Sequence, residues 1–303
     1  MANLNFYIGK LFSTVANICL FLIYIISPLA GTYYLIFGSL TTQIILISLL
    51  AYQYFFCTKN ETFIRFVRKL DLMNFFDEYG LELDDQSLKD RRENTLICHH
   101  PHGVMTYGMA ALSPQLEFFD SYVYLGSRMI LVLPWGGIIM ILRGIQGVDP
   151  ENFKRLMKKK QNVIIIPGGF EEVTITNHEE DRVFIKERKG FIKYALQYGY
   201  KVYPSYCFNE NKTYFYFTWI KFGLLMNKIK IPGVIFMSKF LNFLPNENCR
   251  LITVIGEGIQ LPLKESPTKE EVNHYHEIYV QNLVSLFDKY KGKYGGSRTL
   301  KIY

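Results

Sequence analysis

The sequence predicts an α/β protein, a mixed sheet flanked by helices, preceded by an N-terminal transmembrane helical hairpin. Two observations support this prediction. Two long apolar stretches without a charged residue lie near the N-terminus, and short β-branched runs alternate with helical patterns through the rest of the chain. Alternation of strands with helices is typical of α/β domains.

The two apolar stretches cover residues 11–29 and 33–57. Each is long enough to cross a bilayer, which takes about 20 residues of helix. Small and turn-forming residues between Ser27 and Thr32 predict the turn of a hairpin. The stretches are too long for a secretory signal. A pair of buried core helices is the alternative interpretation.

Flanking charges indicate the orientation of the hairpin. Lys10 precedes the first stretch, and four basic residues lie between 59 and 69, just after the second. The positive-inside rule then places both termini in the cytosol. We therefore expect a membrane hairpin over residues 1–60 and a cytosolic, membrane-associated domain over 61–303.

Composition narrows the class of protein. The chain has 303 residues, of which 49% are hydrophobic, and a formal net charge of +7. This length suffices for one sizeable core. The positive charge suits a membrane surface or a phosphate-bearing ligand, whereas nucleic acid is not expected as a partner of an anchored chain. The five cysteines are scattered and include no CxxC pair, which indicates reduced thiols on a cytosolic face.

The expected strands and helices of the domain are taken in chain order. An amphipathic helix over 61–79 precedes a polar loop over 81–94. Strands are expected at 95–99, 121–125, 162–166, 201–208, 213–218 and 250–255. Helices are expected at 104–112, from 150 to the lysines at 158–160, at 189–198, and from Thr268 to about Lys291.

Local signals mark where these helices begin and end. Asp149 followed by Pro150 is a helix start, because aspartate caps free N–H groups and proline suits the first turn. Gly199 ends the helix over 189–198, and Thr268 with Glu271 forms a capping box.

Two further apolar segments have open interpretations. Residues 129–142, MILVLPWGGIIMIL, either line an acyl channel or form part of the core. Residues 219–244 carry lysines spaced among large apolar side chains. We expect this segment to lie on or dip into the membrane. Ordinary helices packed on the sheet are the alternative.

The stretch CHHPHG, residues 98–103, follows a predicted strand and precedes a predicted helix. This position exposes side chains and free backbone N–H groups. A histidine here, His100 or His102, could act as a general base near neutral pH. Three histidines so close in sequence cannot easily bind one metal ion, so no metal site is expected. Cys98 as a nucleophile and a purely structural histidine turn remain alternatives.

Two more motifs suit the same chemistry. PGGFEE at 167–172 follows a buried strand, so amides at Gly168 and Gly169 could hold an oxyanion, and Glu172 could orient a histidine or a substrate hydroxyl. In ERKGF, Arg188 and Lys189 open a predicted helix, where cations are unfavourable unless they face an anion such as a phosphate. A solvated acidic loop and a surface basic pair are the alternative interpretations.

These motifs together resemble one known family. HPHG at 100–103, PGGFEE at 167–172, RKGF at 188–191 and FNEN at 208–211 occur in that order. They resemble the type-2 diacylglycerol acyltransferase family, which includes monoacylglycerol acyltransferases and wax synthases. The N-terminal hairpin and the C-terminal stretch from TVIGEGIQLP onward are similar too, so the resemblance covers nearly the whole chain.

The resemblance implies kinship with the glycerol-phosphate acyltransferase fold, whose members pair a histidine with an acid five positions later. Met105 and Tyr107 occupy those positions after His100 and His102, so the acid must come from elsewhere, and Glu172 is our candidate. Asn209 stands where the family usually has the glycine of a GEN triplet. The family's YFP motif upstream of the histidines is absent.

The resemblance also implies a reaction. A membrane-bound O-acyltransferase of the endoplasmic reticulum would move a fatty acyl group from acyl-CoA to a lipid alcohol. Diacylglycerol is the expected acceptor, with monoacylglycerol or a long-chain alcohol as alternatives. No cofactor is expected, because acyl-CoA is a co-substrate. A non-catalytic lipid-binding membrane protein is the competing hypothesis, and the oligomeric state, including a homo-oligomer, stays open.

Residue roles follow from the same resemblance. His102 or His100 would be the base and Glu172 its acid partner. A second group would bind acyl-CoA or the oxyanion: Gly103, Gly168, Gly169, Arg188, Lys189 and Asn211.

Overall fold

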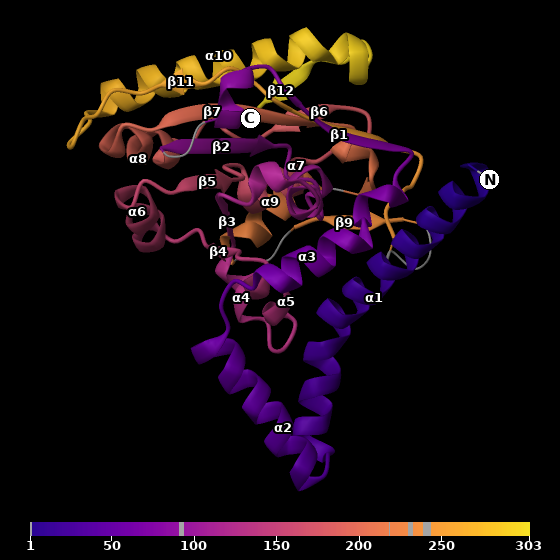
Figure 1. Ribbon diagram of the computed structural model, residues 1–303. Coiled ribbons are helices and arrows are strands. Elements are labelled where there is room, and N and C mark those ends of the chain that lie inside the picture. The colour runs from indigo at the N-terminus through magenta and orange to yellow at the C-terminus, as the bar shows by residue number, and fades with distance from the viewer. Residues whose placement is uncertain (1, 91–93, 218, 230–232, 239–243) are drawn as a thin grey trace.

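The computed structural model describes residues 2–90, 94–217, 219–229, 233–238 and 244–303. It shows a mixed α/β domain with two long helices that project from it as a V (Figure 1). This agrees with the predicted α/β class.

The main sheet of the described residues has eight strands, in the order β1-β10-β7-β2-β5-β3-β4, with β11 paired to β7. Its strands are β1 (Glu78–Leu83), β2 (Thr95–His100), β3 (Tyr122–Gly126), β4 (Gln146–Gly147), β5 (Asn162–Ile165), β7 (Lys201–Phe208), β10 (Arg250–Ile255) and β11 (Ile259–Gln260). From β7 through β2, β5, β3 and β4 the neighbours are parallel, whereas β10 is antiparallel to β7. The carboxyl ends of the parallel strands therefore lie at one edge.

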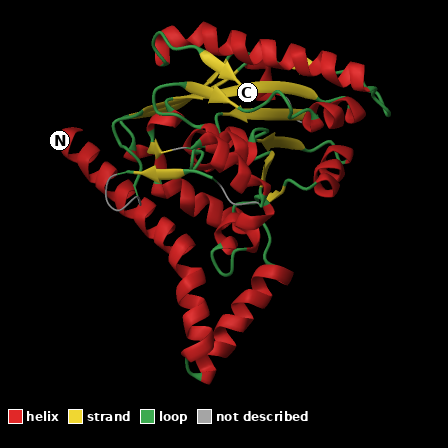
Figure 2. Ribbon diagram, turned by 180° about the vertical axis from the view of Figure 1, so that it is seen from behind, coloured by secondary structure: helices red, strands yellow, loops and turns green. Residues whose placement is uncertain are grey.

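Alternating side chains build a core on each face of the sheet. Leu96 and Cys98 of β2 pack in the cluster beneath α6 (Pro150–Lys158), α8 (Gly190–Tyr198) and α10 (Lys269–Tyr294). Ile97 points the other way, into a cluster with Met109 and Phe119 from the loops after β2. Figure 2 shows α10 lying along the sheet from behind. This alternation decides which face each histidine of β2 reaches.

Smaller elements surround the carboxyl edge. They are α7 (Gly169–Ile175), β6 (Asp181–Val183) paired with β12 (Leu300–Ile302), and β8 (Phe215–Phe217) paired with β9 (Ile235–Met237), with α9 (Ile220–Lys228) between β8 and β9 in the chain. Polar contacts join α7 to α9, since Thr174 Oγ1 lies 3.1 Å from Asn227 Oδ1. Close contact of Gly223 with Gly233 packs the segment after α9 against that helix.

The V consists of α1 (Ala2–Phe37) and of α2 (Leu40–Ala51), which continues into the π-helix Tyr52–Phe56. The turn predicted between residues 27 and 32 is wrong, because α1 runs through Pro28 and the chain reverses at Gly38–Ser39 instead. Thr32 Oγ1 donates to the Pro28 carbonyl at 2.7 Å. Ser39 caps α2 through its side chain, which accepts a bond from Thr42 N. Pro28, a residue typical of turns, therefore lies inside a helix.

Within the described residues, one helix is long and apolar enough to cross a membrane, over Tyr7–Tyr24. A second span exists only if Leu40–Phe56 and Glu61–Phe75, bent by 108° at their junction, are counted together. Two separate spans at 11–29 and 33–57 are therefore not confirmed.

The apolar segment 129–142 packs between the two helices of the V. It forms α4 (Arg128–Val132) and α5 (Gly137–Leu142) around Trp135, whose indole N–H donates to the Leu46 carbonyl at 3.1 Å. Gly31 of α1 lies against the same indole, because a Cβ there would be 2.4 Å from the ring. Gln53 donates to the carbonyls of Leu131 and Leu133, both at 3.0 Å. The segment thus joins α1 to α2.

The other predicted elements have mixed outcomes. The strands at 95–99, 121–125, 162–166, 201–208 and 250–255 and the helices after Asp149, Lys189 and Thr268 are confirmed, with ends shifted by a few residues. The loop over 81–94 is wrong at its start, where β1 pairs with β10; residues 91–93 lie outside the described part. The strand over 213–218 is the shorter β8, and Thr218 is also outside it.

Two predicted helices differ in form. The helix over 61–79 is α3 (Glu61–Leu70), followed by a 3-10 turn at Leu72–Phe75. The helix over 104–112 is a single π-helical turn, Tyr107–Ala111, entered through Thr106 at a φ of 55°.

Candidate active site

Three turns meet at the carboxyl edge of the sheet. β7, β2 and β5 are adjacent and parallel, so the segments after them leave the sheet side by side. These segments are residues 101–103, 166–169 and 209–211, which belong to HPHG, PGGFEE and FNEN. Ligand sites of α/β sheets lie at this edge. The topology therefore brings together three motifs that are distant in the sequence.

His100 ends β2 and is fully buried. Its Nδ1 lies 3.1 Å from both carboxylate oxygens of Glu172, and its Nε2 lies 3.1 Å from the Tyr279 hydroxyl of α10. Both ring nitrogens thus have protein partners. A substrate could reach this ring only by displacing one of them.

His102 is half-buried and bonds differently. Its Nδ1 lies 2.8 Å from the Gly103 carbonyl oxygen. A carbonyl only accepts, so Nδ1 carries the hydrogen. In the neutral ring Nε2 then has a free lone pair, and no described residue hydrogen-bonds to it. Burial lowers the pKa of His102, against the opposing effects of the Gly103 carbonyl and Glu172, which favours this neutral form at pH 7.

Glu172 connects the two histidines. Its Oε1 accepts a bond from the backbone N–H of His102 at 2.7 Å, and its Oε2 accepts one from Phe184 N at 2.9 Å. The carboxylate is fully buried. Gly168 makes room for it, because a Cβ at that position would lie 2.1 Å from Oε2. The first glycine of PGGFEE thus lets this carboxylate fold back against its own turn.

The remaining glycines of the site adopt left-handed conformations. Gly103 has a φ of 56°, and so does Gly169 at the start of α7. Glycine is the residue that reaches this region without strain. These two positions thus shape the turns around Glu172 and His102.

Cys98 lies on the same face of β2 as His100, with its thiol beside the Tyr279 hydroxyl, whereas His99 points to the other face. Burial raises the pKa of the Cys98 thiol well above its usual range, which leaves it protonated and a poor nucleophile. His99 reaches the opposite face of the sheet from His100, where its Nδ1 lies 3.0 Å from Ser205 Oγ. Burial lowers the pKa of His99 well below its usual range.

Arg188 and Lys189 precede α8 instead of opening it, since the helix begins at Gly190. Arg188 forms an ion pair with Glu171, the neighbour of Glu172, and Lys189 donates to the Asn273 side chain at 2.7 Å. The anion that Arg188 faces in this structure is thus a protein carboxylate. Both cations lie on the partly exposed side of the site.

Asn211 is not hydrogen-bonded to either histidine. It is buried, and its amide donates to the carbonyls of Asn177 at 2.9 Å and Glu180 at 3.2 Å. It therefore fixes the loop after α7. Asn209 explains the departure from the family's glycine, because its φ is 66° and asparagine tolerates this region better than most residues.

Glu210 is the residue of this edge that the sequence analysis missed. It lies between Asn209 and Asn211 and is fully buried. Its carboxylate accepts bonds from Tyr107 N at 2.9 Å and Gly108 N at 2.7 Å. The FNEN motif itself was the available signal.

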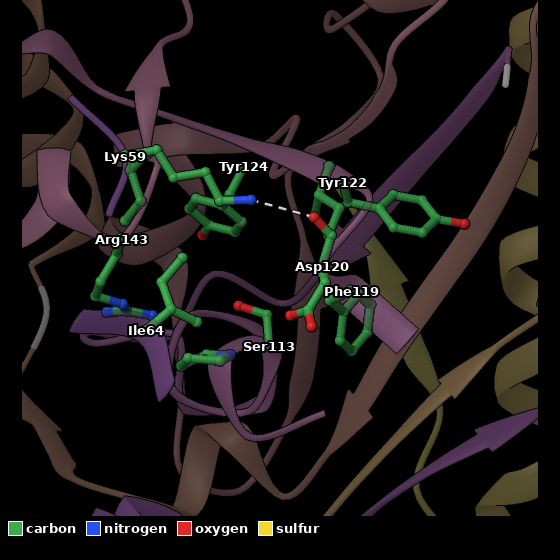
Figure 3. A pocket seen from close by; sticks show the side chains of 11 residues that line it. Lys59, Ile64, Ser113, Phe119, Asp120, Tyr122, Tyr124 and Arg143 are labelled. Carbon is green, nitrogen blue, oxygen red and sulfur yellow. Dashed lines mark hydrogen bonds between the residues drawn. The ribbon is translucent and has the colours of Figure 1, made fainter. Parts of the chain in front are cut away.

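A cavity of about 40 Å³ lies beside the site and includes neither histidine (Figure 3). Lys59 Nζ donates across it to the Asp120 carbonyl at 3.2 Å. Burial lowers the pKa of Arg143 to about 10. The Tyr124 hydroxyl interacts with both Arg143 and Thr106, and Thr106 Oγ1 lies 3.5 Å from His102 Nδ1. This polar chain links the cavity to the candidate base.

The described residues contain no group of three or more histidine, cysteine, aspartate or glutamate side chains that could hold a metal ion. His100 and His102 face different partners, as described above.

Comparisons with known proteins agree on one family. A family model described as diacylglycerol acyltransferase matches residues 34–303. Diacylglycerol O-acyltransferase 2 of Dictyostelium discoideum is 28% identical over 287 residues, covering 85% of this chain and 86% of that protein. Diacylglycerol O-acyltransferase 2-like protein 6 of Mus musculus is 29% identical and covers 78% of each chain. Diacylglycerol O-acyltransferase 2 of Homo sapiens is 31% identical over 67% of this chain and 58% of its own length.

Among solved structures, the 1-acyl-sn-glycerophosphate acyltransferase of Thermotoga maritima matches with a TM-score of 0.46 and 12% identity, covering 94% of this chain and 98% of that one.

Proposed function

Because the chain belongs to the diacylglycerol acyltransferase family and is an acyltransferase, we propose that it moves a fatty acyl group from acyl-CoA to diacylglycerol, giving triacylglycerol. The family description and the names of the relatives support diacylglycerol as the acceptor. Acyl-CoA serves as co-substrate, and no further cofactor takes part.

His102 is the general base in this proposal. The observation that carries it is the bond from Nδ1 to the Gly103 carbonyl, which leaves Nε2 as the acceptor. Nε2 takes the proton of the acceptor hydroxyl while the oxygen attacks the thioester carbonyl carbon. A C–O bond forms, the C–S bond breaks, and the proton passes from His102 to the departing sulfur to give the coenzyme A thiol. General-base help of this kind is worth about 10²–10⁴-fold.

Glu172 and His100 support the base. Glu172 holds the backbone of His102 and is itself held by His100, so its carboxylate favours the imidazolium that forms at His102 during the reaction. This arrangement supplies the acid that is missing five residues after either histidine. His100 is a positioning residue here, because both of its nitrogens already have protein partners.

The oxyanion and the coenzyme require further groups. Backbone amides near Gly103, Gly168 and Gly169 are the proposed oxyanion donors, each worth about 3–4 kcal/mol in comparable sites. Arg188 and Lys189 are the proposed contacts for the coenzyme phosphates. Their present partners, Glu171 and Asn273, lie on the partly exposed side and can exchange for a ligand. Asn211 supports the site indirectly, through the loop after α7.

The fatty acyl chain and the diacylglycerol acceptor reside in the bilayer, so we propose that residues 1–60 anchor the 61–303 domain to a membrane. The endoplasmic reticulum, with both termini cytosolic, is the expected location.

A second apolar surface, separate from residues 1–60, supports docking of the domain on the membrane. Its exposed members lie on β8, α9 and β9: Phe215, Phe217, Trp219, Phe222, Leu225, Ile229, Ile235 and Met237. Residues 230–232 and 239–243 of the predicted membrane-lying segment are outside the described part.

The test is a membrane assay with labelled acyl-CoA and four competing acceptors: diacylglycerol, monoacylglycerol, a long-chain alcohol and a sterol. Wild-type membranes should form triacylglycerol, and His102→Ala membranes should not. His274→Ala is the matched control, because that histidine is exposed on α10. A wax ester or diacylglycerol as the main product would reassign the acceptor, and equal product from His102→Ala would exclude this base.

A further inference from the structure

Two buried carboxylates hold the loop that carries His102, one at each end. Glu172 accepts from the N–H of His102 at the start of the loop. Glu210 accepts from the N–H groups of Tyr107 and Gly108 at its end. Gly103 packs directly on Glu210, because a Cβ there would lie 2.7 Å from Glu210 Cγ and 2.8 Å from Oε1.

Glu210 differs from Glu172 in its surroundings. Glu172 faces the His100 ring, whereas none of the described residues forms an ion pair with Glu210. The titratable groups that its charge affects are all tyrosines and cysteines, which are neutral at pH 7: Tyr107, Tyr124, Cys207, Tyr214, Tyr216 and Cys249. A buried carboxylate that is balanced by two backbone N–H groups and the neutral Cys207 thiol, with no cation, is costly. Such a cost at a site edge points to a role in function.

Resting on the acyl transfer proposed above, we propose that Glu210 is a positioning residue for His102 whose charged form completes the loop and whose protonation releases it. Both carboxylate oxygens are needed, since each accepts one N–H. In a protonated carboxyl the hydroxyl oxygen becomes a donor and only a weak, uncharged acceptor, so one of the two N–H groups is held less tightly.

Burial raises the pKa of Glu210 to about 7, against the lowering effect of the two backbone bonds. Acidification through this value therefore protonates Glu210 before His102, whose pKa is lowered from the usual value of 6.5. Turnover should fall in two steps as the pH decreases, first with Glu210 and then with His102.

The geometry of the loop explains how protonation of Glu210 can change the position of the His102 ring. Thr106 lies between the two anchored ends, with a φ of 55°, and its hydroxyl approaches His102 Nδ1. The next N–H groups, those of Tyr107 and Gly108, are the ones that Glu210 binds. When these two hydrogen bonds weaken, Thr106 can move, and the imidazole of His102 can turn away from the Gly103 carbonyl.

Steady-state kcat and KM would be measured between about pH 4.5 and pH 9 for wild type, Glu210→Gln and Glu210→Asp, so that both protonation steps lie within the range. Glu210→Gln cannot titrate, and its amide N–H₂ faces a donor, so kcat should fall by about 10²-fold with KM nearly unchanged. The acid limb of its pH–kcat profile should show one protonation step, that of His102, instead of two. Glu210→Asp retains a titrating carboxyl and should retain the two-proton limb. Glu179→Gln, an exposed glutamate, is the matched control.

A purely structural Glu210 would lower stability and leave the shape of the pH profile unchanged, and that result would overturn the inference. If Glu210→Gln does not accumulate, the kcat of Glu210→Asp decides: the shorter side chain should not reach both N–H groups, so kcat should fall, and a wild-type kcat excludes the role. His102→Ala in the same assay separates the two proposals. Full activity of His102→Ala refutes the proposed base, whereas an inactive His102→Ala beside an unchanged Glu210→Gln profile refutes only the role of Glu210.

Discussion

His100 and His102 stand two residues apart, yet the fold treats them in opposite ways. His100 is the last residue of β2, is fully buried, and has Glu172 and Tyr279 on its two nitrogens. His102 lies past the end of the strand, is half-buried, and has its Nδ1 bonded to Gly103. One histidine thus supports the site and the other presents a free nitrogen to it.

The difference shows that a cluster of histidines need not share one role. Strand alternation sends His99 and His100 to opposite faces, and the turn that follows releases His102 from the sheet. The Glu172 carboxylate then contacts both residues: it lies beside the His100 ring and accepts a hydrogen bond from the backbone N–H of His102.

The largest expected effect separates the two histidines by activity and stability together. His102→Ala should lower kcat by about 10²–10⁴-fold with little change in the thermal midpoint, because the ring is only half-buried. His100→Ala should also abolish turnover, but it leaves the buried Glu172 without its imidazole partner. Breaking such a pair costs about 3–5 kcal/mol. Thermal unfolding in detergent measures this difference, and equal midpoints for the two variants would refute the division of roles.

A smaller effect is expected at Tyr279. Tyr279→Phe removes the hydroxyl beside His100 Nε2 and leaves the ring packing intact. The same hydroxyl also donates to the Cys98 carbonyl at 3.4 Å. Each lost hydrogen bond costs about 1 kcal/mol, and kcat should fall only several-fold. His276 lies on the same helix, and its Nε2 donates to the Ile185 carbonyl. Substitution of His276 would therefore show the effect of losing a hydrogen bond of α10 that does not involve His100. A loss at Tyr279→Phe as large as that of His102→Ala would place Tyr279 in the chemistry itself.

Part of this site could be predicted from sequence. The strand before His100, the turn at Gly103 and the glycine-rich turn before Glu172 have local signals. The sequence predicts Glu172 as a carboxylate that could orient one of the histidines, and the structure shows that this histidine is His100. This pairing depends on β5 lying next to β2, a contact that no local pattern encodes.

Other features could not be predicted, for different reasons. Glu210 lies beside the His102 loop because β7 is the other neighbour of β2, which brings FNEN next to HPHG. Pro28 is typical of a turn, but it removes only the hydrogen bond to the carbonyl of Tyr24, and α1 continues to the reversal at Gly38–Ser39. For Glu210 the deciding contact therefore lies outside the local segment.

The stability of the protein should respond to pH in two opposing directions. Burial lowers the pKa of His99 and His102 from 6.5, so the unfolded chain binds more protons than the folded one below about pH 6.5. Their contribution is therefore lost as the pH falls through that range. Glu210 acts oppositely, because its pKa is raised from 4.5 to about 7, and its contribution is lost as the pH rises through that window.

Glu210→Gln removes one of these two responses and so tests them separately. The thermal midpoint of wild type minus that of Glu210→Gln should decrease from pH 5 to pH 8, whatever its value at either pH. Glu179→Gln should show no such slope. A constant difference across this range would mean that Glu210 does not titrate there.

The smallest effect is expected at Arg188, on the partly exposed side of the site and away from both histidines. Arg188 pairs with Glu171 and is partly exposed, and pairs of this kind contribute about 0–1 kcal/mol. Arg188→Gln should therefore leave the thermal midpoint nearly unchanged. If Arg188 exchanges Glu171 for a coenzyme phosphate, KM for acyl-CoA should rise several-fold while kcat stays within about two-fold, and added salt should raise the wild-type KM in the same direction. Lys186→Gln, which removes an exposed cation from the same segment, is the control. An unchanged KM for Arg188→Gln would restrict Arg188 to holding Glu171, and the coenzyme would then have to be bound by other residues.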